Sequence, residues 1–338
     1  GVEPRDVYAM GRQNWFSHVR GEHAHVREKA GIFDQSSFAK YSVEGRDALK
    51  VLNRVSAANV DVEPGRIVYT QWLNERGGIE ADLTVTRLEE NKFLVVTGAA
   101  PQTRDMAWLK RHTPSDAHCV ATDITSGLPM IAIMGPKSRA LLEAVSGEDL
   151  SNAAFPFGTS REIEIGYARV RASRITYVGE LGWELHMPMA DMPAVYDALM
   201  AAGKPFGIRL FGTYAMNSLR MEKSYRGWGS ELTTEIDMIE ASMERFLRLD
   251  KPDFIGKAAL EQQLAAGVPH RFITLEVHGV TDADPLGNEP IFGPDGKLVG
   301  RAHCALCDVT HSPVRRKAEW DRMTAGLGVP FELVHLNE

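Results

Sequence analysis

One stretch of alternating residues offers a carboxylate that could take part in chemistry. From Ile79 to Thr86, apolar and polar side chains alternate, which predicts a strand with one buried face and one polar face. Asp82 lies on the polar face, where a fixed carboxylate could stabilise a positive charge or accept a proton. The alternative is a solvated strand residue, and the stretch alone favours that interpretation.

A second carboxylate follows a glycine-containing turn. Residues 177–185 read YVGELGWEL, so Tyr177 precedes the turn and Glu184 lies in the strand after it. A glutamate in such a strand is commonly solvated, and a simple hairpin is the alternative interpretation of this stretch.

A third stretch places a cation beside aromatic rings. Residues 219–232 read LRMEKSYRGWGSEL, in which a helix carrying Arg220 breaks into a glycine-containing loop around Trp228. Trp228 and Tyr69 could form the wall of a binding site, because aromatic faces pack well against conjugated rings. Each of these aromatic residues, taken alone, is more often part of a core.

Histidine and cysteine residues form two groups whose residue types could bind a metal ion. The first lies in the N-terminal part of the chain: His18, His23 and His25. Their mixed spacing among many charges favours a solvated helix face over a metal site. The second lies near the C-terminus: His303, Cys304, Cys307 and His311. It has the spacing of a metal half-site or a redox pair, but no second C-x-x-C completes a zinc site, so we predict unpaired thiols and no metal.

The hydrophobic pattern predicts the elements that must position these residues. The loop 74–78 joins two extended runs into the hairpin that carries Asp82, and its Gly-Gly pair supplies positive φ angles for the turn. A long alternating run, 161–177, leads through a turn to a second strand. The other predicted elements are helices 15–30, 47–55, 101–111, 138–145 and 213–223, and strands 92–96, 128–134 and 183–187. Strands paired by hairpins and interleaved with helices predict an α+β fold with antiparallel sheets.

The composition is that of an ordinary globular protein. The chain has 338 residues, of which 44% are hydrophobic and 25% charged, enough for one large domain or two or three smaller ones. Its formal net charge of −7 argues against binding nucleic acid, whose phosphates need a basic surface. No apolar run approaches the roughly 20 residues that a membrane span requires.

The cysteine count bears on the compartment. Three cysteines argue against a disulfide framework, so a reducing compartment fits the chain better. We therefore expect a cytoplasmic protein, with the mitochondrial matrix as the alternative. No signal peptide is visible, yet the chain starts at Gly1 without methionine, so we expect a piece of a longer polypeptide.

Taken together, the three stretches resemble one superfamily, that of the glycine-cleavage T-protein (aminomethyltransferase). Residues 64–88, PGRIVYTQWLNERGGIEADLTVTRL, resemble its folate-site stretch, and YVGELGWEL resembles its Y-x-G-E-x-G-(aromatic)-E signature. The block RMEKSYRGWG and the block around Asn14-Trp15-Phe16 are more similar to the C-terminal, tetrahydrofolate-binding half of dimethylglycine and sarcosine dehydrogenases. The resemblance extends from about Tyr8 to about Ala302.

The resemblance implies a role for each candidate residue. Asp82 matches the aspartate that faces the folate and is the principal catalytic carboxylate of the family. Glu184 matches the glutamate that accepts two parallel donors from the pterin edge, an amino group beside a ring N–H. The other residues implied to bind tetrahydrofolate are Tyr69, Thr97, Tyr177, Arg220 and Trp228. T-proteins usually have asparagine at the position of Thr97, and the dehydrogenase branch tends to read as this chain does.

The resemblance also implies a division of the chain. Residues 1–265 match the folate-binding aminomethyltransferase-like region, which consists of two interleaved α+β subdomains. Residues 266–303 follow the start of the family's C-terminal barrel domain, and residues 304–338 do not match. We therefore expect the barrel to be incomplete or replaced, with a helix starting at Ser312 and a strand over 331–336.

The implied function is tetrahydrofolate-dependent one-carbon transfer. A folate nitrogen is expected to attack an iminium or aminomethyl carbon, derived in the dehydrogenases from dimethylglycine or sarcosine, which gives methylene-tetrahydrofolate. Tetrahydrofolate is the expected cofactor. FAD is expected only on a fused or partner domain, because no strand–G-x-G-x-x-G–helix motif occurs in this chain. The expected partners are therefore a folate, an amine-derived iminium and a flavin domain, without nucleic acid or membrane.

Two alternative functions remain open. One is a glycine-cleavage T-protein proper, which takes an aminomethyl group from a lipoyl carrier, although the N-terminal and R-G-W-G blocks favour the dehydrogenase branch. The other is a folate-binding module without catalysis, against which the retained Asp82 argues.

Overall fold

A five-stranded antiparallel sheet forms one half of the fold. The structure is a computed structural model that describes residues 5, 7, 13–274 and 290–301. The strands of this sheet are β2 (Ala39–Glu44), β3 (Ile67–Leu73), β4 (Ile79–Glu89), β5 (Lys92–Thr97) and β6 (Val120–Asp123). They are arranged in the order β3-β4-β5-β2-β6, with every neighbouring pair antiparallel.

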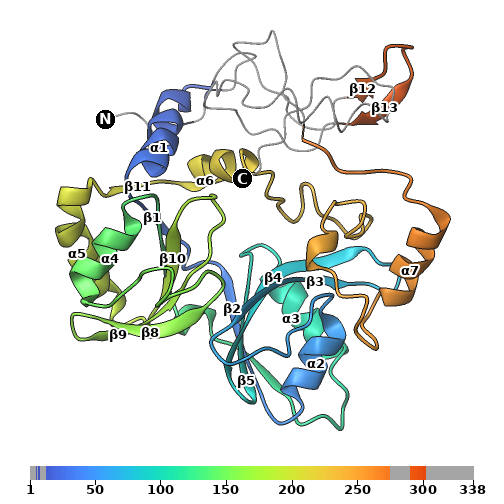
Figure 1. Ribbon diagram of the computed structural model, residues 1–338, viewed down its shortest axis with the longest axis horizontal. Coiled ribbons are helices and arrows are strands. Elements are labelled where there is room, and N and C mark those ends of the chain that lie inside the picture. Colours follow the sequence, from blue (N-terminus) through green and yellow to red (C-terminus); the bar gives the residue numbers. More distant parts are fainter. Residues whose placement is uncertain (1–4, 6, 8–12, 275–289, 302–338) are drawn as a thin grey trace.

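A six-stranded sheet forms the other half (Figure 1). Its strands are β1 (Gly31–Asp34), β7 (Met130–Met134), β8 (Ser160–Ile165), β9 (Ala168–Ser173), β10 (Gly182–His186) and β11 (Arg209–Leu210). Their order is β11-β1-β7-β10-β9-β8, and only the β1–β11 pair is parallel. A separate ladder consists of β12 (Pro290–Phe292) and β13 (Leu298–Arg301). No sheet of the described residues closes into a barrel.

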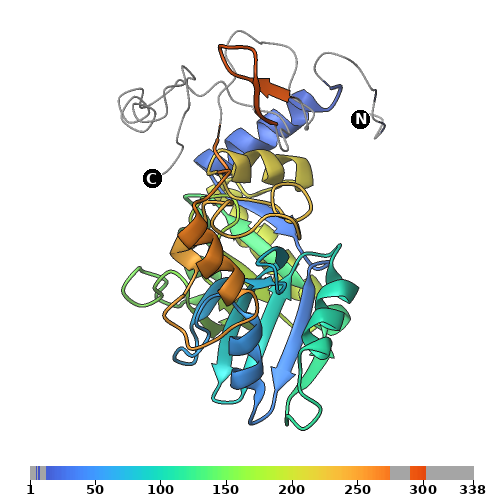
Figure 2. The same ribbon diagram turned by 90° about the vertical axis from the view of Figure 1, so that its right-hand side faces the viewer.

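Helices cover the sheets. The helices are α1 (Phe16–Glu28), α2 (Ala48–Val55), α3 (Gln102–Arg111), α4 (Ser138–Ser146), α5 (Met192–Gly203), α6 (Thr213–Met221) and α7 (Lys257–Ala266). Side chains of α2 and α3 complete the core of the five-stranded sheet, and α4 and α5 do so for the six-stranded sheet. Helices α1 and α6 lie side by side over β7 and belong to a further cluster (Figure 2). Within the described part of the chain, no helix has the length and apolar character needed to cross a bilayer.

The chain interleaves the two sheets. It starts in the six-stranded sheet with β1, builds all of the five-stranded sheet from β2 to β6, and returns with β7. Leu94 and Val96 of β5 pack against Met130 of β7, so the two sheets contact each other through side chains opposite their main cores. The division of the chain at residue 265 stays a prediction.

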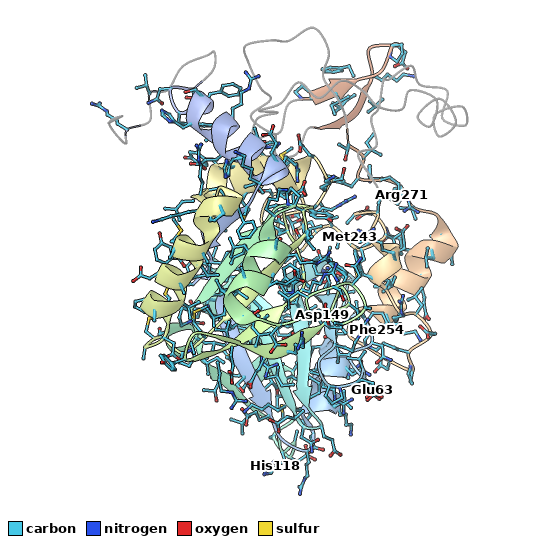
Figure 3. All side chains as sticks on the ribbon, turned by 60° about the vertical axis from the view of Figure 1, so that its left-hand side comes forward. Glu63, His118, Asp149, Met243, Phe254 and Arg271 are labelled. Atoms are coloured by element: carbon cyan, nitrogen blue, oxygen red, sulfur yellow. The ribbon has the colours of Figure 1, made fainter. Side chains whose placement is uncertain are left out.

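The segment that contains Thr234 packs against the β3–β4 hairpin. Gly77 takes the expected positive φ of 88°, but Gly78 is needed for a different reason. A Cβ at Gly78 would lie 1.9 Å from the carbonyl oxygen of Thr234, so only glycine lets the two backbones approach. The β3–β4 hairpin, the later segment and α7 all contribute side chains to one hydrophobic cluster, which includes Met243 and Phe254 (Figure 3).

One predicted element is wrong. The alternating run 161–177 was expected as a single long strand, whereas the chain folds back within it as β8 and β9. Ile165 pairs with Ala168, which leaves Gly166 and Tyr167 as the turn, and Gly166 has a φ of 61°. The two-residue turn shifts the alternation by one residue, because Ile163 and Ile165 face the core before it and Ala168 and Val170 after it. Tyr167 continues the apolar positions of the first strand and so hides the shift in the sequence.

Candidate functional site

The β3–β4 hairpin gathers polar side chains on one face. In its register Gln71 lies opposite Asp82, and Tyr69 lies opposite Thr84. Cross-strand partners share a face, so these four side chains lie on the side away from Leu83, which enters the core. Gln71 donates a hydrogen bond from Nε2 to an Asp82 carboxylate oxygen at 2.7 Å. The alternation predicted for this strand is confirmed from Ile79 to Val85, whereas Thr86 is buried.

Asp82 is a carboxylate with a raised pKa. Burial removes water from around the group and raises its pKa to about 6. Hydrogen bonds from Tyr69 and Gln71 favour the ionised form and limit the rise. Although protein atoms surround the carboxylate, the residue is only half-buried by exposed area, so a ligand can still reach it. At neutral pH it is therefore an anion that can accept a proton.

Tyr69 links Asp82 to aromatic residues. Its hydroxyl is hydrogen-bonded to Asp82, and burial together with the charge of Asp82 raises the pKa of Tyr69 well above its ordinary value. The ring packs edge-on against Phe246, with 4.7 Å between the ring centroids. Tyr177 lies within electrostatic reach of the same hydroxyl. Tyr69 therefore stays neutral and can donate its hydrogen bond to the carboxylate.

Tyr177 connects the loop after α6 to Tyr69 and Asp82. Its hydroxyl donates to the carbonyl oxygen of Arg226 at 2.8 Å. Its ring stacks on that of Tyr225, with the centroids 6.3 Å apart and the planes at 19°. The loop that carries Trp228 is thereby brought beside Tyr69 and Asp82.

One face of Trp228 is covered by the protein. The Arg104 guanidinium lies over the ring, 4.4 Å from its centroid, and is itself paired with Glu80. The indole N–H donates to the carbonyl oxygen of Ile79 at 3.2 Å. Trp228 is therefore fixed at the start of β4, and its other face is the one that could receive a ligand ring.

Glu184 lies on β10, on the face away from the core of the six-stranded sheet. Its neighbours Trp183 and Leu185 enter that core. Only 7% of Glu184 is exposed, and burial raises its pKa to about 7, while the charge of Lys40 lowers it. Among the described residues no hydrogen-bond donor reaches its carboxylate. A buried carboxylate without donors is costly, so a ligand with N–H donors would stabilise it.

The pKa of Glu184 leads to a prediction about ligand binding. A ligand that donates N–H bonds favours the ionised carboxylate, so binding should lower the pKa from about 7 and release protons at neutral pH. Affinity should accordingly fall roughly tenfold per pH unit below that pKa. Calorimetric titration with a reduced folate, in two buffers that differ in ionisation enthalpy, measures the release.

Two variants give this prediction its controls. Glu184→Gln should weaken reduced-folate binding by a few kcal/mol at most, which is about the value of one bidentate charge-assisted contact, and should abolish the proton release. Glu164→Gln removes an exposed carboxylate from β8 and should change neither quantity. A wild-type affinity that does not depend on pH would contradict the role given to Glu184.

Arg220 is engaged inside the protein. Its Nη1 lies 2.8 Å from a carboxylate oxygen of Glu231, and the two side chains are 4% and 2% exposed. It also donates to the Asn217 side chain at 2.6 Å and to the Tyr225 carbonyl at 2.9 Å. The second Glu231 oxygen accepts the Gly227 N–H at 2.8 Å. These contacts hold the loop in place, and a direct folate contact of Arg220 stays a prediction.

Thr97 lies on the other face of the sheet from Asp82. The register pairs it with the core residue Leu83, and its hydroxyl donates to Asp105 at 2.7 Å. Burial raises the pKa of Asp105 to about 6, and this hydrogen bond limits the rise. The structure therefore brings Asp82, Tyr69, Tyr177 and Trp228 together and turns the Thr97 side chain away from them.

The family model described as the GCVT N-terminal domain matches residues 2–251. The chain belongs to this family. Human mitochondrial dimethylglycine dehydrogenase is 38% identical over 291 residues, which cover 86% of this chain and 33% of the relative. An aminomethyltransferase of Halalkalibacterium halodurans is 34% identical over 263 residues, 78% of this chain and 71% of the relative. The chain thus spans about a third of the length of the dehydrogenase.

A solved structure of a GCVT protein agrees with the fold. The crystal structure of glycine cleavage system aminomethyltransferase T from Bartonella henselae superposes with a TM-score of 0.74 at 25% identity, covering 84% of this chain and 76% of that one. The predicted aminomethyltransferase fold, with antiparallel sheets and flanking helices, is confirmed.

Two buried groups near Glu184 were missed by the sequence analysis of this GCVT chain. Lys40, on β2, donates to the Ser36 carbonyl at 2.9 Å, and burial lowers its pKa to about 8. His186, on β10, has its pKa lowered to about 3 by burial and is neutral. The signal for His186 was its position two residues after Glu184, on the same face of a strand. Lys40 was detectable as a lysine among the buried residues of a strand.

The histidine prediction for α1 is wrong in part. His23 was expected on a solvated face, yet it is 1% exposed. Its Nδ1 lies 3.1 Å from the Ser218 hydroxyl and its Nε2 lies 3.1 Å from Glu222, because α6 packs on α1. In the described part of the chain no three metal-binding side chains converge. Outside it lie His303, Cys304, Cys307, His311, the helix expected from Ser312 and the strand expected over 331–336.

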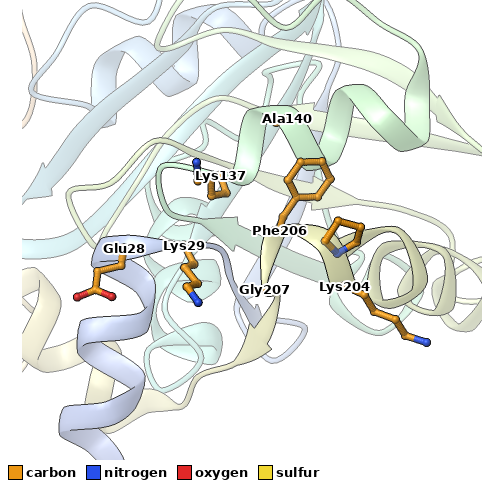
Figure 4. A pocket seen from close by; sticks show the side chains of 8 residues that line it. Glu28, Lys29, Lys137, Ala140, Lys204, Phe206 and Gly207 are labelled. Carbon is orange, nitrogen blue, oxygen red and sulfur yellow. The ribbon is translucent and has the colours of Figure 1, made fainter.

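A surface hollow of about 430 Å³ lies elsewhere on the protein (Figure 4). Its lining includes Lys29, Lys137 and Lys204 around Phe206. None of the residues that this GCVT chain places around Asp82 or Glu184 lines it, so the hollow is separate from the candidate site.

Proposed function

We propose that this chain transfers a one-carbon unit to tetrahydrofolate, as the folate half of a flavoenzyme like dimethylglycine or sarcosine dehydrogenase. The observation that carries the proposal is Glu184, a buried carboxylate that no described residue supplies with a hydrogen-bond donor. The pterin edge presents two parallel N–H donors, which a carboxylate can accept bidentately. Membership of the GCVT family supports the same ligand.

Asp82 is the group that we propose for the transfer step. Bound tetrahydrofolate supplies two nucleophilic nitrogens. In the overall reaction two new C–N bonds form to the one-carbon unit, the iminium C=N bond breaks, and two N–H protons leave, one of them to the released amine. An ionised Asp82 stabilises the positive charge of the iminium, and its pKa of about 6 suits it to take up the second proton and pass it to solvent.

The aromatic residues position the ligand in this proposal. Tyr69, Tyr177 and Trp228 offer aromatic surfaces against which a conjugated ring packs. Tyr69 also holds the Asp82 carboxylate by a hydrogen bond, so the ring surface and the charge keep a fixed relation to each other.

We further propose that a flavin domain, fused or separate, oxidises the amine and delivers the iminium. Dimethylglycine dehydrogenase, of which this chain spans about a third, supports a division of labour of this kind. The cytoplasm is the proposed location, with the mitochondrial matrix as the alternative. A reactive iminium would need to reach the folate before it hydrolyses, which favours close association of the two halves.

The purified chain tests this function directly. It should be colourless, bind tetrahydrofolate, and fail to oxidise dimethylglycine or sarcosine with a dye acceptor. It should still accelerate methylene-tetrahydrofolate formation when a flavoprotein supplies the iminium. The measurements are an absorbance spectrum, a calorimetric titration and a dye-linked assay. A bound-flavin spectrum with amine turnover would overturn the assignment of the oxidative step to another domain, and absence of folate binding would overturn the function itself.

A further inference from the structure

Arg226 is a partly buried cation that forms no ion pair with an acidic residue of the described chain. It lies in the loop after α6, and its guanidinium packs over the ring of Phe272, 4.6 Å from the centroid. Its Nη1 donates to the Ser224 carbonyl oxygen. Its Nε is buried and has no hydrogen-bond partner among the residues that the structure describes. The side chain thus retains donor capacity that the described chain does not use.

The carboxylates nearest to Arg226 form ion pairs with other arginines. Glu231 is paired with Arg220 at 2.8 Å, and Glu244 is paired with Arg271. Both attract Arg226 only at longer range. A largely desolvated guanidinium without an anion is costly, so an anionic ligand would compensate for a cost that the protein already bears.

The position of Arg226 connects it to the proposed folate site. Its charge acts on Tyr69, whose hydroxyl is bonded to Asp82. The backbone carbonyl oxygen of Arg226 accepts a hydrogen bond from the Tyr177 hydroxyl. The cation therefore lies beside the residues proposed to hold the reacting ligands.

The backbone around Arg226 is held in an unusual conformation. Ser224 and Ser242 have φ values of 55° and 54°, in the left-handed region that non-glycine residues rarely adopt. The Ser224 hydroxyl bonds that of Thr274 at 2.6 Å, and the Ser242 hydroxyl donates to the Phe272 carbonyl at 3.1 Å. Both strained positions thus fix the segment that carries Phe272, the ring under the guanidinium. Pre-organisation of this kind reduces the entropy that is lost when a ligand binds.

We infer that Arg226 binds a carboxylate of a ligand at this site. The inference rests on the proposed function, within which two sources share this chemistry: the glutamyl tail of tetrahydrofolate and the amino-acid part of the iminium. A guanidinium presents a planar fork of N–H donors that matches a carboxylate better than an ammonium does. Arg226 is accordingly a specificity-determining residue that separates carboxylate-bearing ligands from neutral ones.

The first arm of the test compares two reduced pterins. Tetrahydrofolate carries the benzoylglutamyl tail, and 6-methyltetrahydropterin lacks it. If the tail is the source, Arg226→Gln should weaken tetrahydrofolate binding roughly 10- to 100-fold, as loss of a charge-assisted hydrogen bond typically does, and leave 6-methyltetrahydropterin unchanged. Arg226→Lys should recover part of the loss. Arg245→Gln removes an exposed guanidinium that packs on Phe246 and should bind both compounds as the wild type does.

The second arm varies the one-carbon donor. If the iminium is the source, Arg226→Gln should raise the KM for the formaldehyde adduct of glycine, which bears a carboxylate, by a similar factor. The KM for formaldehyde alone should stay unchanged, and so should tetrahydrofolate affinity.

The outcomes separate the inference from the proposed function. Unchanged behaviour of Arg226→Gln in both arms would overturn the inference, and so would equal weakening of tetrahydrofolate and 6-methyltetrahydropterin, which indicates a structural role. A wild type that binds neither pterin would overturn the proposed function and, with it, this inference.

Discussion

Asp82→Asn should slow one-carbon transfer roughly 100-fold or more while leaving tetrahydrofolate binding largely intact. The carboxylate is proposed to stabilise positive charge in the transition state and to take up a proton, and an amide does neither. Steady-state transfer rates with a formaldehyde donor, together with a calorimetric titration, measure the two quantities separately.

The surroundings of Asp82 make this substitution a clean test of charge. Gln71 now donates to Asp82 from Nε2, and its own Oε1 is buried without a partner among the described residues. A flip of the Gln71 amide would turn Oε1 toward an asparagine amide at position 82, so the hydrogen bond can persist after the charge is removed. Unfolding free energy should therefore change little, and a loss of rate can be attributed to chemistry.

A matched variant and the pH profile complete the test. Asp105→Asn removes another buried carboxylate with a pKa near 6, but one bonded to Thr97 on the opposite face, and transfer should stay within a few-fold of the wild type. The wild-type rate should fall as the pH falls through about 6, where Asp82 becomes protonated, and the asparagine variant should lose this dependence. An Asp82→Asn variant with the wild-type rate would remove Asp82 from the mechanism.

Arg220→Ala should lower the free energy of unfolding by roughly 3–5 kcal/mol, because it leaves Glu231 as a buried charge without its cation. Folate affinity should fall as well, since the loop that carries Trp228 loses its support. Denaturant unfolding followed by circular dichroism measures the stability, and titration of the folded variant measures the affinity.

A double variant distinguishes support of the loop from direct ligand contact. Arg220→Met combined with Glu231→Leu removes both charges and should recover a large part of the lost stability. If Arg220→Ala instead keeps wild-type stability and loses only folate affinity, Arg220 contacts the folate directly, as the family resemblance implies. The two interpretations of Arg220 thus predict different changes in stability, although both predict a loss of folate affinity.

Local patterns predicted the strand and the loop of the hairpin at the centre of the site. Alternation along 79–86 predicts which of its side chains share a face, whereas the pairing of Gln71 with Asp82 depends on a register shift between Trp72 and Leu73 that the pattern does not show. The turn between β8 and β9 was missed because Tyr167 continues the apolar positions of β8, which hides the one-residue shift in the alternation between Ile165 and Ala168.

Partners from distant parts of the chain could not be predicted. The sequence shows Arg220 and Glu231 as charges, but only the folded loop shows that they neutralise each other. Likewise His23 was assigned to solvent because nothing in α1 indicates that α6 will cover it. Buried polar pairs depend on tertiary packing, and local periodicity does not encode that packing.

The strand order has a consequence for biosynthesis. All strands of the five-stranded sheet have been synthesised once Asp123 has been added to the chain. Strand β1 instead pairs with β7 on one side and with β11 on the other, and β11 ends only at Leu210. At roughly 5–20 residues per second, about 10–35 s separate the emergence of β1 from that of its last partner. During that interval the nascent chain exposes the unpaired edge of β1, Gly-Ile-Phe-Asp, to other strands. A chaperone could bind this edge until β11 pairs with it.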